Sequence, residues 1–138
     1  MEGSTLMAGA PAAPSVPVVM PQTRRKVVDI GGIETEIVVQ GFQDAIFVVI
    51  TQLKKLGTLI MTHIERGRTG KCLFDARVLL GKRDDPLLVL YARQIAEQIS
   101  TRTTYDRNVV LSIALKEDGR GPAAFQETIN HVLDLPVW

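Results

Sequence analysis

The sequence is poor in the residues that carry most metal and nucleophilic chemistry. Its 138 residues include one cysteine, Cys72, and two histidines, His63 and His131. A single cysteine cannot form an internal disulfide, which excludes a secreted disulfide framework and favours a reducing compartment. No set of cysteines or acidic residues accompanies the histidines at metal-ligand spacing, so no metal or cofactor is expected.

A strong net charge is also missing. The chain has 16 lysines and arginines against 15 aspartates and glutamates, which gives a formal net charge of +1. Proteins that bind DNA or RNA usually carry a basic excess, because neutralisation of phosphates drives their affinity. The balance of charge therefore argues against a nucleic-acid partner.

Long apolar runs are absent as well. The longest, residues 45–50 and 87–90, are far shorter than the roughly 18 residues that a membrane span needs. The start of the chain also lacks the basic segment and the apolar stretch of a signal peptide. We therefore expect a cytoplasmic protein with no membrane partner.

Residues 1–23 differ in composition from the rest of the chain. Prolines punctuate a stretch of alanine, glycine, serine and valine at Pro11, Pro14, Pro17 and Pro21. Prolines at this density interrupt helices and sheet ladders alike, so the pattern predicts a mobile, extended tail followed by a single domain at 24–138. Recognition of the tail by an aromatic groove, as in an adaptor, is the alternative.

The domain is expected to contain six strands and two helices. Runs of β-branched and apolar residues between turn signals predict strands at 24–30, 33–40, 45–52, 58–64, 74–80 and 108–116. Gly31-Gly32 is typical of a hairpin turn, and short turns between the first four strands predict an antiparallel meander. The basic segment 65–71 contains two glycines and is expected to form an exposed, flexible loop.

Each predicted helix begins with a proline. Asp84-Asp85-Pro86 is typical of a capped helix start, and Pro122 is placed in the same way at the second helix. Each helix carries one apolar stripe, formed by Leu88, Ala92, Ile95 and Ile99 in the first and by Phe125, Ile129, Val132 and Leu133 in the second. Pro136 ends the second helix and leaves Val137-Trp138 as a tail.

The predicted fold class is α+β, with a mainly antiparallel sheet of about six strands and two helices on one face. Two helices cannot cover both faces, yet the strands at 45–52 and 108–116 are apolar on both. We infer that a dimer partner covers the other face, and we assign Phe47 and Val49, which share one face of a strand, to that contact. The alternative is that the face of Phe47 packs on the helices, because the sequence does not distinguish the two faces. A sheet that curls on itself is the alternative to a dimer.

No catalytic site is apparent. The glycine-containing stretch 67–72 lacks the first glycine and the hydroxyl residue of a phosphate-binding loop, and it precedes a strand instead of a helix. Cys72 has basic neighbours but no identifiable general base, so a structural thiol is favoured over a nucleophile. We therefore expect a protein-binding protein and no enzyme, with a small ligand-binding or adaptor domain as the alternative.

Several short motifs follow one another in a recognisable order. They are Val49-Ile50-Thr51-Gln52, Lys55-Leu56-Gly57-Thr58-Leu59, Arg77-Val78-Leu79-Leu80-Gly81, Asp85-Pro86-Leu87, the apolar strand 109–115 with Lys116 after it, and the terminal Val137-Trp138. In this order and at this spacing, over residues 25–138, the sequence resembles the proteasome assembly chaperone 3 family.

The resemblance implies a non-catalytic protein with a sheet of about six strands and two helices. It also implies a dimer, typically with a proteasome assembly chaperone 4-like protein, and a homodimer of this chain alone is the alternative. The dimer is expected to bind α-type subunits of the 20S proteasome core, to promote formation of the α-ring, and to leave before the core is complete.

The sequence departs from the family pattern in two places. The proline-rich tail has no counterpart, and the loop at 65–72 is strongly basic where relatives are richer in serine. We assign Arg66, Arg68 and Lys71 as mobile electrostatic contacts to an α-type subunit, because exposed charges mainly tune association rates. A solvated loop without a partner is the alternative.

Overall fold

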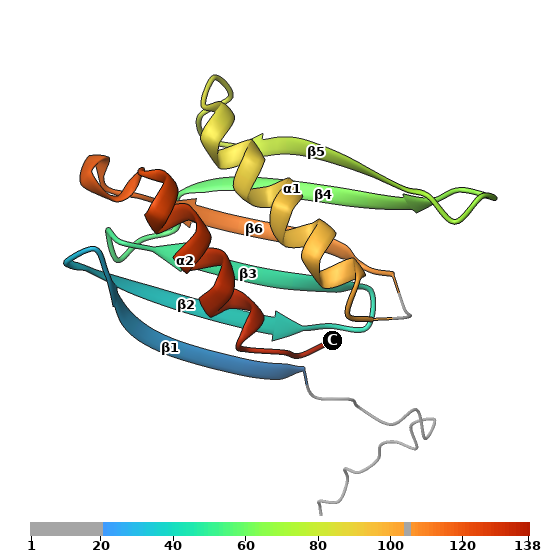
Figure 1. Ribbon diagram of the computed structural model, residues 1–138, viewed down its shortest axis with the longest axis horizontal. Coiled ribbons are helices and arrows are strands. Elements are labelled where there is room, and N and C mark those ends of the chain that lie inside the picture. The colour runs from blue at the N-terminus through green and yellow to red at the C-terminus, as the bar shows by residue number, and fades with distance from the viewer. Residues whose placement is uncertain (1–20, 104–105) are drawn as a thin grey trace, which may run out of the picture.

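A computed structural model describes residues 21–103 and 106–138 of the chain. The described residues form six strands and two α-helices, with a short 3-10 turn at Glu117–Gly119 (Figure 1). In chain order these are β1 Gln22–Ile30, β2 Ile33–Gly41, β3 Ala45–Thr51, β4 Thr58–Arg66, β5 Cys72–Leu80, α1 Pro86–Ser100, β6 Asn108–Ala114 and α2 Pro122–Leu133. The predicted order is confirmed, and every strand ends within two residues of its predicted bounds.

The first strand begins earlier than predicted. Residues 1–20, which make up most of the predicted tail, lie outside the described residues. The predicted start at Arg24 is two residues late, because β1 begins at Gln22 and Thr23 already pairs with Gln40. The Gln40 side-chain amide also donates a hydrogen bond to Thr23 Oγ1 at 3.2 Å. Pairing with β2 therefore extends β1 into the last residues of the predicted tail.

The strands are arranged in the order β1-β2-β3-β6-β4-β5. The predicted meander of the first four strands is wrong, because β6 lies between β3 and β4, parallel to the first and antiparallel to the second. Five of the seven β6 residues, Val109 and residues 111–114, are buried, so a central position suits this strand best. The loop at 52–57 is long enough to cross the two strand spacings, about 10 Å, between β3 and β4.

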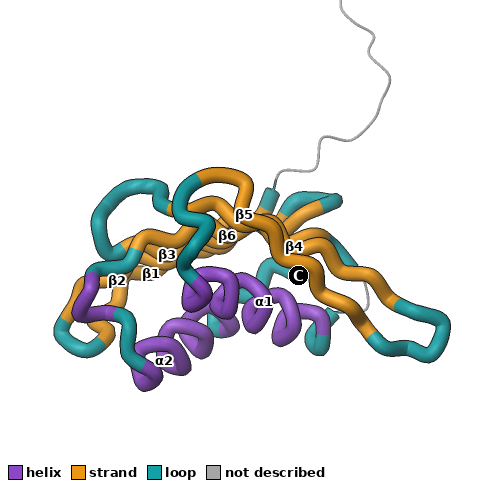
Figure 2. Tube along the Cα trace, turned by 90° about the horizontal axis from the view of Figure 1, so that it is seen from above, coloured by secondary structure: helices purple, strands orange, loops and turns teal. Residues whose placement is uncertain are grey.

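Both helices lie on one face of the sheet (Figure 2). Helix α1 packs across β4, β5 and β6, while α2 packs beside α1 and over β1 and β2. The predicted apolar stripe of α1 is buried in full, together with Tyr91 and Ala96. In α2 only Ile129 and Val132 of the predicted stripe are fully buried, and the Phe125 ring packs on Tyr91 with 4.5 Å between ring centroids.

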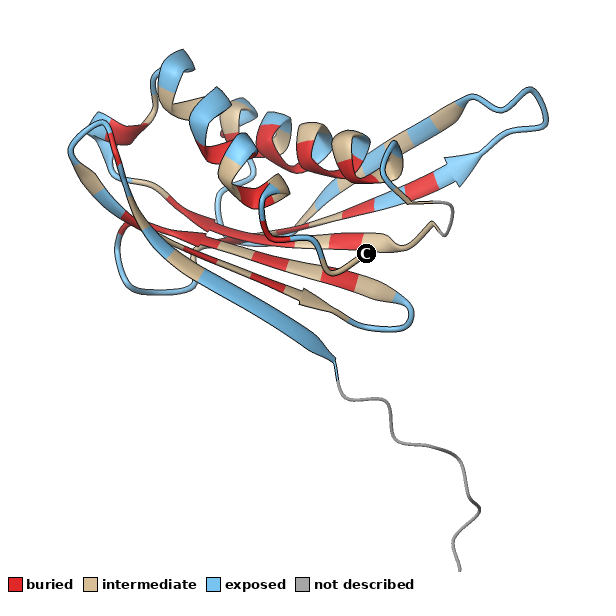
Figure 3. Ribbon diagram, turned by 60° about the horizontal axis from the view of Figure 1, so that its bottom comes forward, coloured by how far each residue is buried: buried red, intermediate tan, exposed pale blue. Residues whose placement is uncertain are grey.

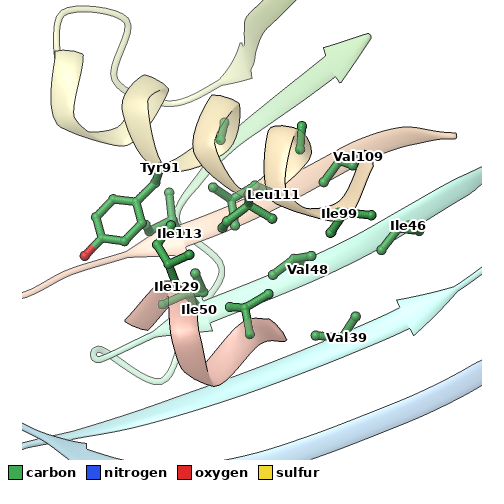
Figure 4. Packing of buried hydrophobic residues seen from close by; sticks show 14 of the residues in the cluster. Val39, Ile46, Val48, Ile50, Tyr91, Ile99, Val109, Leu111, Ile113 and Ile129 are labelled. Carbon is green, nitrogen blue, oxygen red and sulfur yellow. The ribbon is translucent and has the colours of Figure 1, made fainter. Parts of the chain in front are cut away.

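The hydrophobic core fills the space between the helices and the sheet (Figure 4). Every second residue of the four central strands points into it, namely Ile37, Val39, Ile46, Val48, Ile50, Ile60, Val109, Leu111 and Ile113. Full burial of such an aliphatic side chain contributes about 1.5–3 kcal/mol of transfer free energy. The strict alternation leaves the intervening residues on the opposite face of the sheet.

The hairpin turn between β1 and β2 is confirmed. Gly31 and Gly32 have φ angles of 60° and 84°, in the left-handed region that glycine adopts without steric cost. The carboxylate of Asp29 accepts a hydrogen bond from the Gly32 backbone N–H at 2.8 Å.

The end of the chain is not the free tail that the sequence suggested. Val137 and Trp138 are half-buried and pack against the core. A Cβ at Gly41 would lie 2.8 Å from the Val137 carbonyl oxygen, so the chain end lies directly on the end of β2. The terminal Val-Trp motif is therefore part of the folded domain.

The buried side chain of Gln52 joins three segments at one end of the sheet. Its amide nitrogen donates to Thr35 Oγ1 in β2 at 3.1 Å, and its oxygen accepts the backbone N–H of Lys116 at 2.9 Å. A Cβ at Gly119, in the 3-10 turn, would overlap the same amide. We call the loop at 52–57 the end loop. Its first residue, Gln52, is hydrogen-bonded through both the nitrogen and the oxygen of its side-chain amide.

The starts of the two helices are linked by an ion pair. Asp85 occupies the N-cap position of α1, as predicted, although no side-chain capping hydrogen bond of regular geometry is formed. It accepts a hydrogen bond from Arg120 Nη2 at 2.6 Å, and only 10% of its side chain is exposed. This bond lowers the pKa of Asp85 below its ordinary value, although burial acts in the opposite direction.

Gly57→Ala is expected to destabilise the protein. A Cβ at this position would overlap the Ile113 carbonyl oxygen and lie 2.7 Å from Ala114 Cβ, so the end loop would have to move off β6. We expect a loss of about 1–3 kcal/mol in the free energy of unfolding, measured by urea denaturation. Gly121→Ala, where a Cβ meets nothing within 4 Å, is the control with a change below about 1 kcal/mol. Equal losses of unfolding free energy in the two variants would contradict the close contact between Gly57 and β6.

Asp85→Asn is expected to lower stability in a pH-dependent way. The folded-state pKa of Asp85 is lowered, so the ion pair contributes stability above the unfolded-state pKa of about 3.9 and loses it as the pH falls through the folded-state pKa. The difference in unfolding free energy between the wild type and the variant should therefore be largest near neutral pH and shrink in acid. Asp84→Asn, at an exposed neighbour, is the matched control; a difference independent of pH at Asp85 would contradict the ion pair.

Candidate functional site

The face of the sheet opposite the helices carries no helix or strand layer within residues 21–103 and 106–138 (Figure 2). We call this surface the open face. Its central residues are apolar and half-buried, namely Val38, Phe47, Val49, Leu59, Met61 and Val110. The sheet does not close into a barrel, because its two outer strands, β1 and β5, do not pair with each other. An apolar sheet face of this kind normally packs against a further layer.

The open face is apolar in the middle and polar at its sides. One cross-strand row consists of Thr23, Gln40, Phe47, Val110, Met61 and Arg77. The next row consists of Arg25, Val38, Val49, Ser112 and Leu59. An apolar centre inside a polar rim is the usual composition of a protein–protein interface.

The two residues predicted to meet a dimer partner lie at the centre of this surface. Phe47 and Val49 point away from the helices, because the alternate residues of β3 are buried in the core. The structure therefore assigns both residues to the uncovered side of the sheet. The other open-face residues were missed, although the signal was present: they occupy the alternate apolar positions of β2, β4 and β6.

The β4–β5 side of the open face is charged. A hollow of about 260 Å³ is lined by Met61, His63, Glu65, Asp75 and Arg77. His63 is an exposed strand residue, as predicted, and its Nδ1 lies 2.8 Å from Asn108 Oδ1 on β6. Arg77 Nε donates to Asp75 Oδ2 at 3.1 Å. Charged and apolar side chains thus border each other along this flank.

Arg66, predicted as a mobile charge, forms an ion pair within the domain. It is the last residue of β4, and its guanidinium donates two hydrogen bonds of 2.8 Å to the carboxylate of Asp106. This bidentate contact raises the pKa of Arg66 and lowers the pKa of Asp106. The pair joins the β4–β5 hairpin to the segment that precedes β6, and Asp106 has no local sequence signal that would have revealed it.

Arg68 and Lys71 lie in the loop between β4 and β5, at the exposed tip of the hairpin (Figure 3). The loop is a tight turn, closed by a hydrogen bond of 2.8 Å from the Gly67 N–H to the Lys71 carbonyl. Gly70 has a φ of 83°. The tip lies at the end of β4, away from the centre of the open face. The structure therefore keeps Arg68 and Lys71 apart from Phe47 and Val49, the other predicted contact residues.

The described residues hold no group of three or more histidine, cysteine, aspartate or glutamate side chains that could bind a metal ion. Cys72, the first residue of β5, is a free, half-buried thiol. Neither described helix is long and apolar enough to cross a membrane. The arrangement as a whole offers surfaces for contact with other proteins.

Known proteins similar to this chain agree with such a role. A family model described as proteasome assembly chaperone 3 matches residues 48–132, from within β3 to near the end of α2. The proteasome assembly chaperone 3 of Bos taurus is 33% identical over 111 residues, which cover 78% of this chain and 89% of the relative. That of Homo sapiens is 31% identical over 117 residues, with coverages of 83% and 93%.

The fold has a solved counterpart. A chain in the crystal structure of a chaperone complex for yeast 20S proteasome assembly superposes with a TM-score of 0.64 at 12% identity, covering 84% of this chain and 98% of that chain. At this identity the likeness concerns the fold alone. The matched family model and the curated relatives cover most of the domain, so this chain belongs to the proteasome assembly chaperone 3 family of non-catalytic chaperones.

Proposed function

We propose that this chain promotes assembly of the 20S proteasome core as a cytoplasmic, non-catalytic chaperone, and that it binds α-type subunits as a dimer while the α-ring forms. The observation that carries the proposal is the open face, an apolar surface that one chain leaves uncovered. Membership of the assembly chaperone family supports the process in which the chain acts.

The dimer partner covers the open face with a sheet of its own. Two sheets pack face to face with their strands about 30° apart, and their inward side chains interdigitate. Phe47 and Val49 lie at the middle of this contact, where side chains contribute most of the binding energy. The partner is a proteasome assembly chaperone 4-like protein, and a homodimer forms when that protein is absent.

The chaperone acts by position and not by chemistry. A bound α-type subunit is held beside its correct neighbours, which raises its local concentration, while the surfaces that would make wrong contacts are blocked. An interface of ordinary size, roughly 1,200–2,000 Å² in total, is sufficient for such binding.

The charged tip of the β4–β5 hairpin serves as one contact to the α-type subunit. Arg68 and Lys71 are exposed, and neither forms an ion pair with the residues that the structure describes. The Arg66–Asp106 pair holds the base of the hairpin, so it supports the tip without itself meeting the client. Exposed charges of this kind speed diffusional encounter with an acidic surface.

Phe47→Asp is expected to abolish the dimer, because it places an unpaired carboxylate in the apolar centre of the contact. We expect the dissociation constant to rise by about a hundredfold or more, measured by light scattering over a range of concentrations. When the tagged wild type is captured from native extract, a second small assembly chaperone and α-type subunits should accompany it, without mature proteasome. The variant should lose the second chaperone.

The matched control is Leu90→Asp, at an exposed residue of α1 on the opposite side of the sheet. It introduces the same carboxylate and should leave the dimer intact. Circular dichroism should show that both variants keep the wild-type fold, since Phe47 does not pack on the helices. A monomeric wild type that captures neither protein would refute the proposed function.

Replacing Arg68 and Lys71 together by alanine is expected to slow association with an α-type subunit several-fold at low salt and to have little effect at high salt. Surface plasmon resonance at two ionic strengths measures both rates. The control, Arg24→Ala with Arg93→Ala, removes the same charge from two other exposed positions. Association rates at low salt equal to those of the wild type would contradict the role of the hairpin tip.

A further inference from the structure

The end loop, residues 52–57, exposes two leucines that lie outside the strands of the open face. Leu53 is 41% exposed and Leu56 is 68% exposed, while most other large apolar residues of the domain are buried or half-buried. The loop contains the Lys55-Leu56-Gly57 motif and lies at the opposite end of the strands from the β4–β5 hairpin tip (Figure 1). It therefore presents apolar side chains at one end of the sheet, where Leu53 also borders a hollow with Arg25 of the open face.

The backbone of the end loop is held firmly although its leucines are exposed. Thr51 Oγ1 accepts the backbone N–H groups of Leu53 and Lys55, each at 3.2 Å. The Gly57 N–H donates to Ser112 Oγ at 3.3 Å, and Ser112 itself is buried. A loop fixed in this way loses little conformational entropy on binding, which is the property of a preorganised contact.

Beside the loop lies a hollow of about 480 Å³. Its walls come from the end loop, including Leu56, from the end of β6, and from the helix starts, including Leu88 of α1 and the Asp85–Arg120 pair. The hollow thus opens at the end of the sheet where the helices begin.

The charges around the hollow favour an acidic occupant. Lys55 and Lys82 line it, and Lys54 follows Leu53 in the same loop. Among the described residues, neither Lys54 nor Lys55 forms an ion pair. The carboxylate of Asp85 is engaged mainly by Arg120. The other carboxylate of the lining belongs to Glu117, so the three lysines Lys54, Lys55 and Lys82 still leave an excess of positive charge around the opening. Apolar and positively charged groups therefore face the same opening.

We infer that the end loop and this hollow form a docking site for a surface segment of an α-type subunit that presents an aliphatic side chain next to a carboxylate. The aliphatic side chain enters the hollow and packs on Leu56, while the carboxylate pairs with Lys55 and Lys82. This inference rests on the proposed function and adds a second client contact to it, at the opposite end of the sheet from Arg68 and Lys71.

Leu56→Ser tests the apolar part of the contact. The dimer of the full chain with its partner chaperone is titrated with each recombinant α-type subunit by calorimetry. We expect the affinity for the client subunit to fall about tenfold, as for a central apolar contact. Leu90→Ser, at a leucine that is 51% exposed on α1 and lies outside the hollow, is the matched control and should bind as the wild type does.

Lys55→Glu tests the charge. We expect a similar or larger loss of affinity, and we expect the salt dependence of binding to become weaker than in the wild type. Both replaced side chains are exposed, and urea unfolding should show wild-type stability. A wild-type dimer that binds no α-type subunit overturns both this inference and the proposed function. Wild-type affinity in Leu56→Ser and Lys55→Glu, with binding otherwise intact, overturns this inference alone.

An anionic membrane is the other surface that suits leucines flanked by lysines. Vesicles of phosphatidylserine and phosphatidylcholine are therefore mixed with the wild type and sedimented. Absence of co-sedimentation supports the protein occupant. Co-sedimentation that is lost in Leu56→Ser, together with unchanged client affinity, overturns the inference in favour of a lipid surface.

Discussion

The molecule is shaped by the mismatch between a sheet that is apolar on both faces and helices that cover only one of them. Strands β3 and β6 lie side by side at the centre, and each sends one set of side chains into the core and the other set to the open face. The helix-side set accounts for the stability of the single chain. The opposite set contributes to stability only when a second layer covers it. The same two strands therefore supply side chains to the core of one chain and to its contact with a partner.

Local patterns in the sequence were sufficient to predict the strands and helices. They were not sufficient to predict which strands pair with one another. Alternation and turn residues predicted the six strands, and helical spacing predicted the buried stripe of α1, because each depends on residues close together in the chain. The strand order depends on β6, which pairs with strands more than forty residues earlier. Likewise the sequence around Asp85 is that of an ordinary cap, yet Arg120, 35 residues away, takes its carboxylate.

The same limit applies to the candidate surfaces. Alternation alone places Phe47 and Val49 on one face, but only the packing of the helices shows that this face is the open one. The ion pair of Arg66 could not be foreseen, because Asp106 lies 40 residues further on. The exposed leucines of the end loop resemble core residues in the sequence, and only the path of the loop between β3 and β4 turns them outward. The sheet thus carries three candidate surfaces, namely the open face, the tip of the β4–β5 hairpin and the end loop.

The central position of β6 also has a consequence for how the chain is made. The β1-β2-β3 part and the β4–β5 hairpin are joined into one sheet only through β6, which is the last strand to be synthesised. Until residues 108–114 leave the ribosome, the nascent chain holds two partial sheets, each with an unpaired apolar edge. Such edges invite pairing with other chains, and closure requires contacts distant in sequence, which slows folding. A chaperone of this architecture is itself exposed to aggregation late in its own synthesis, and a truncation before β6 leaves two partial sheets that are no longer joined.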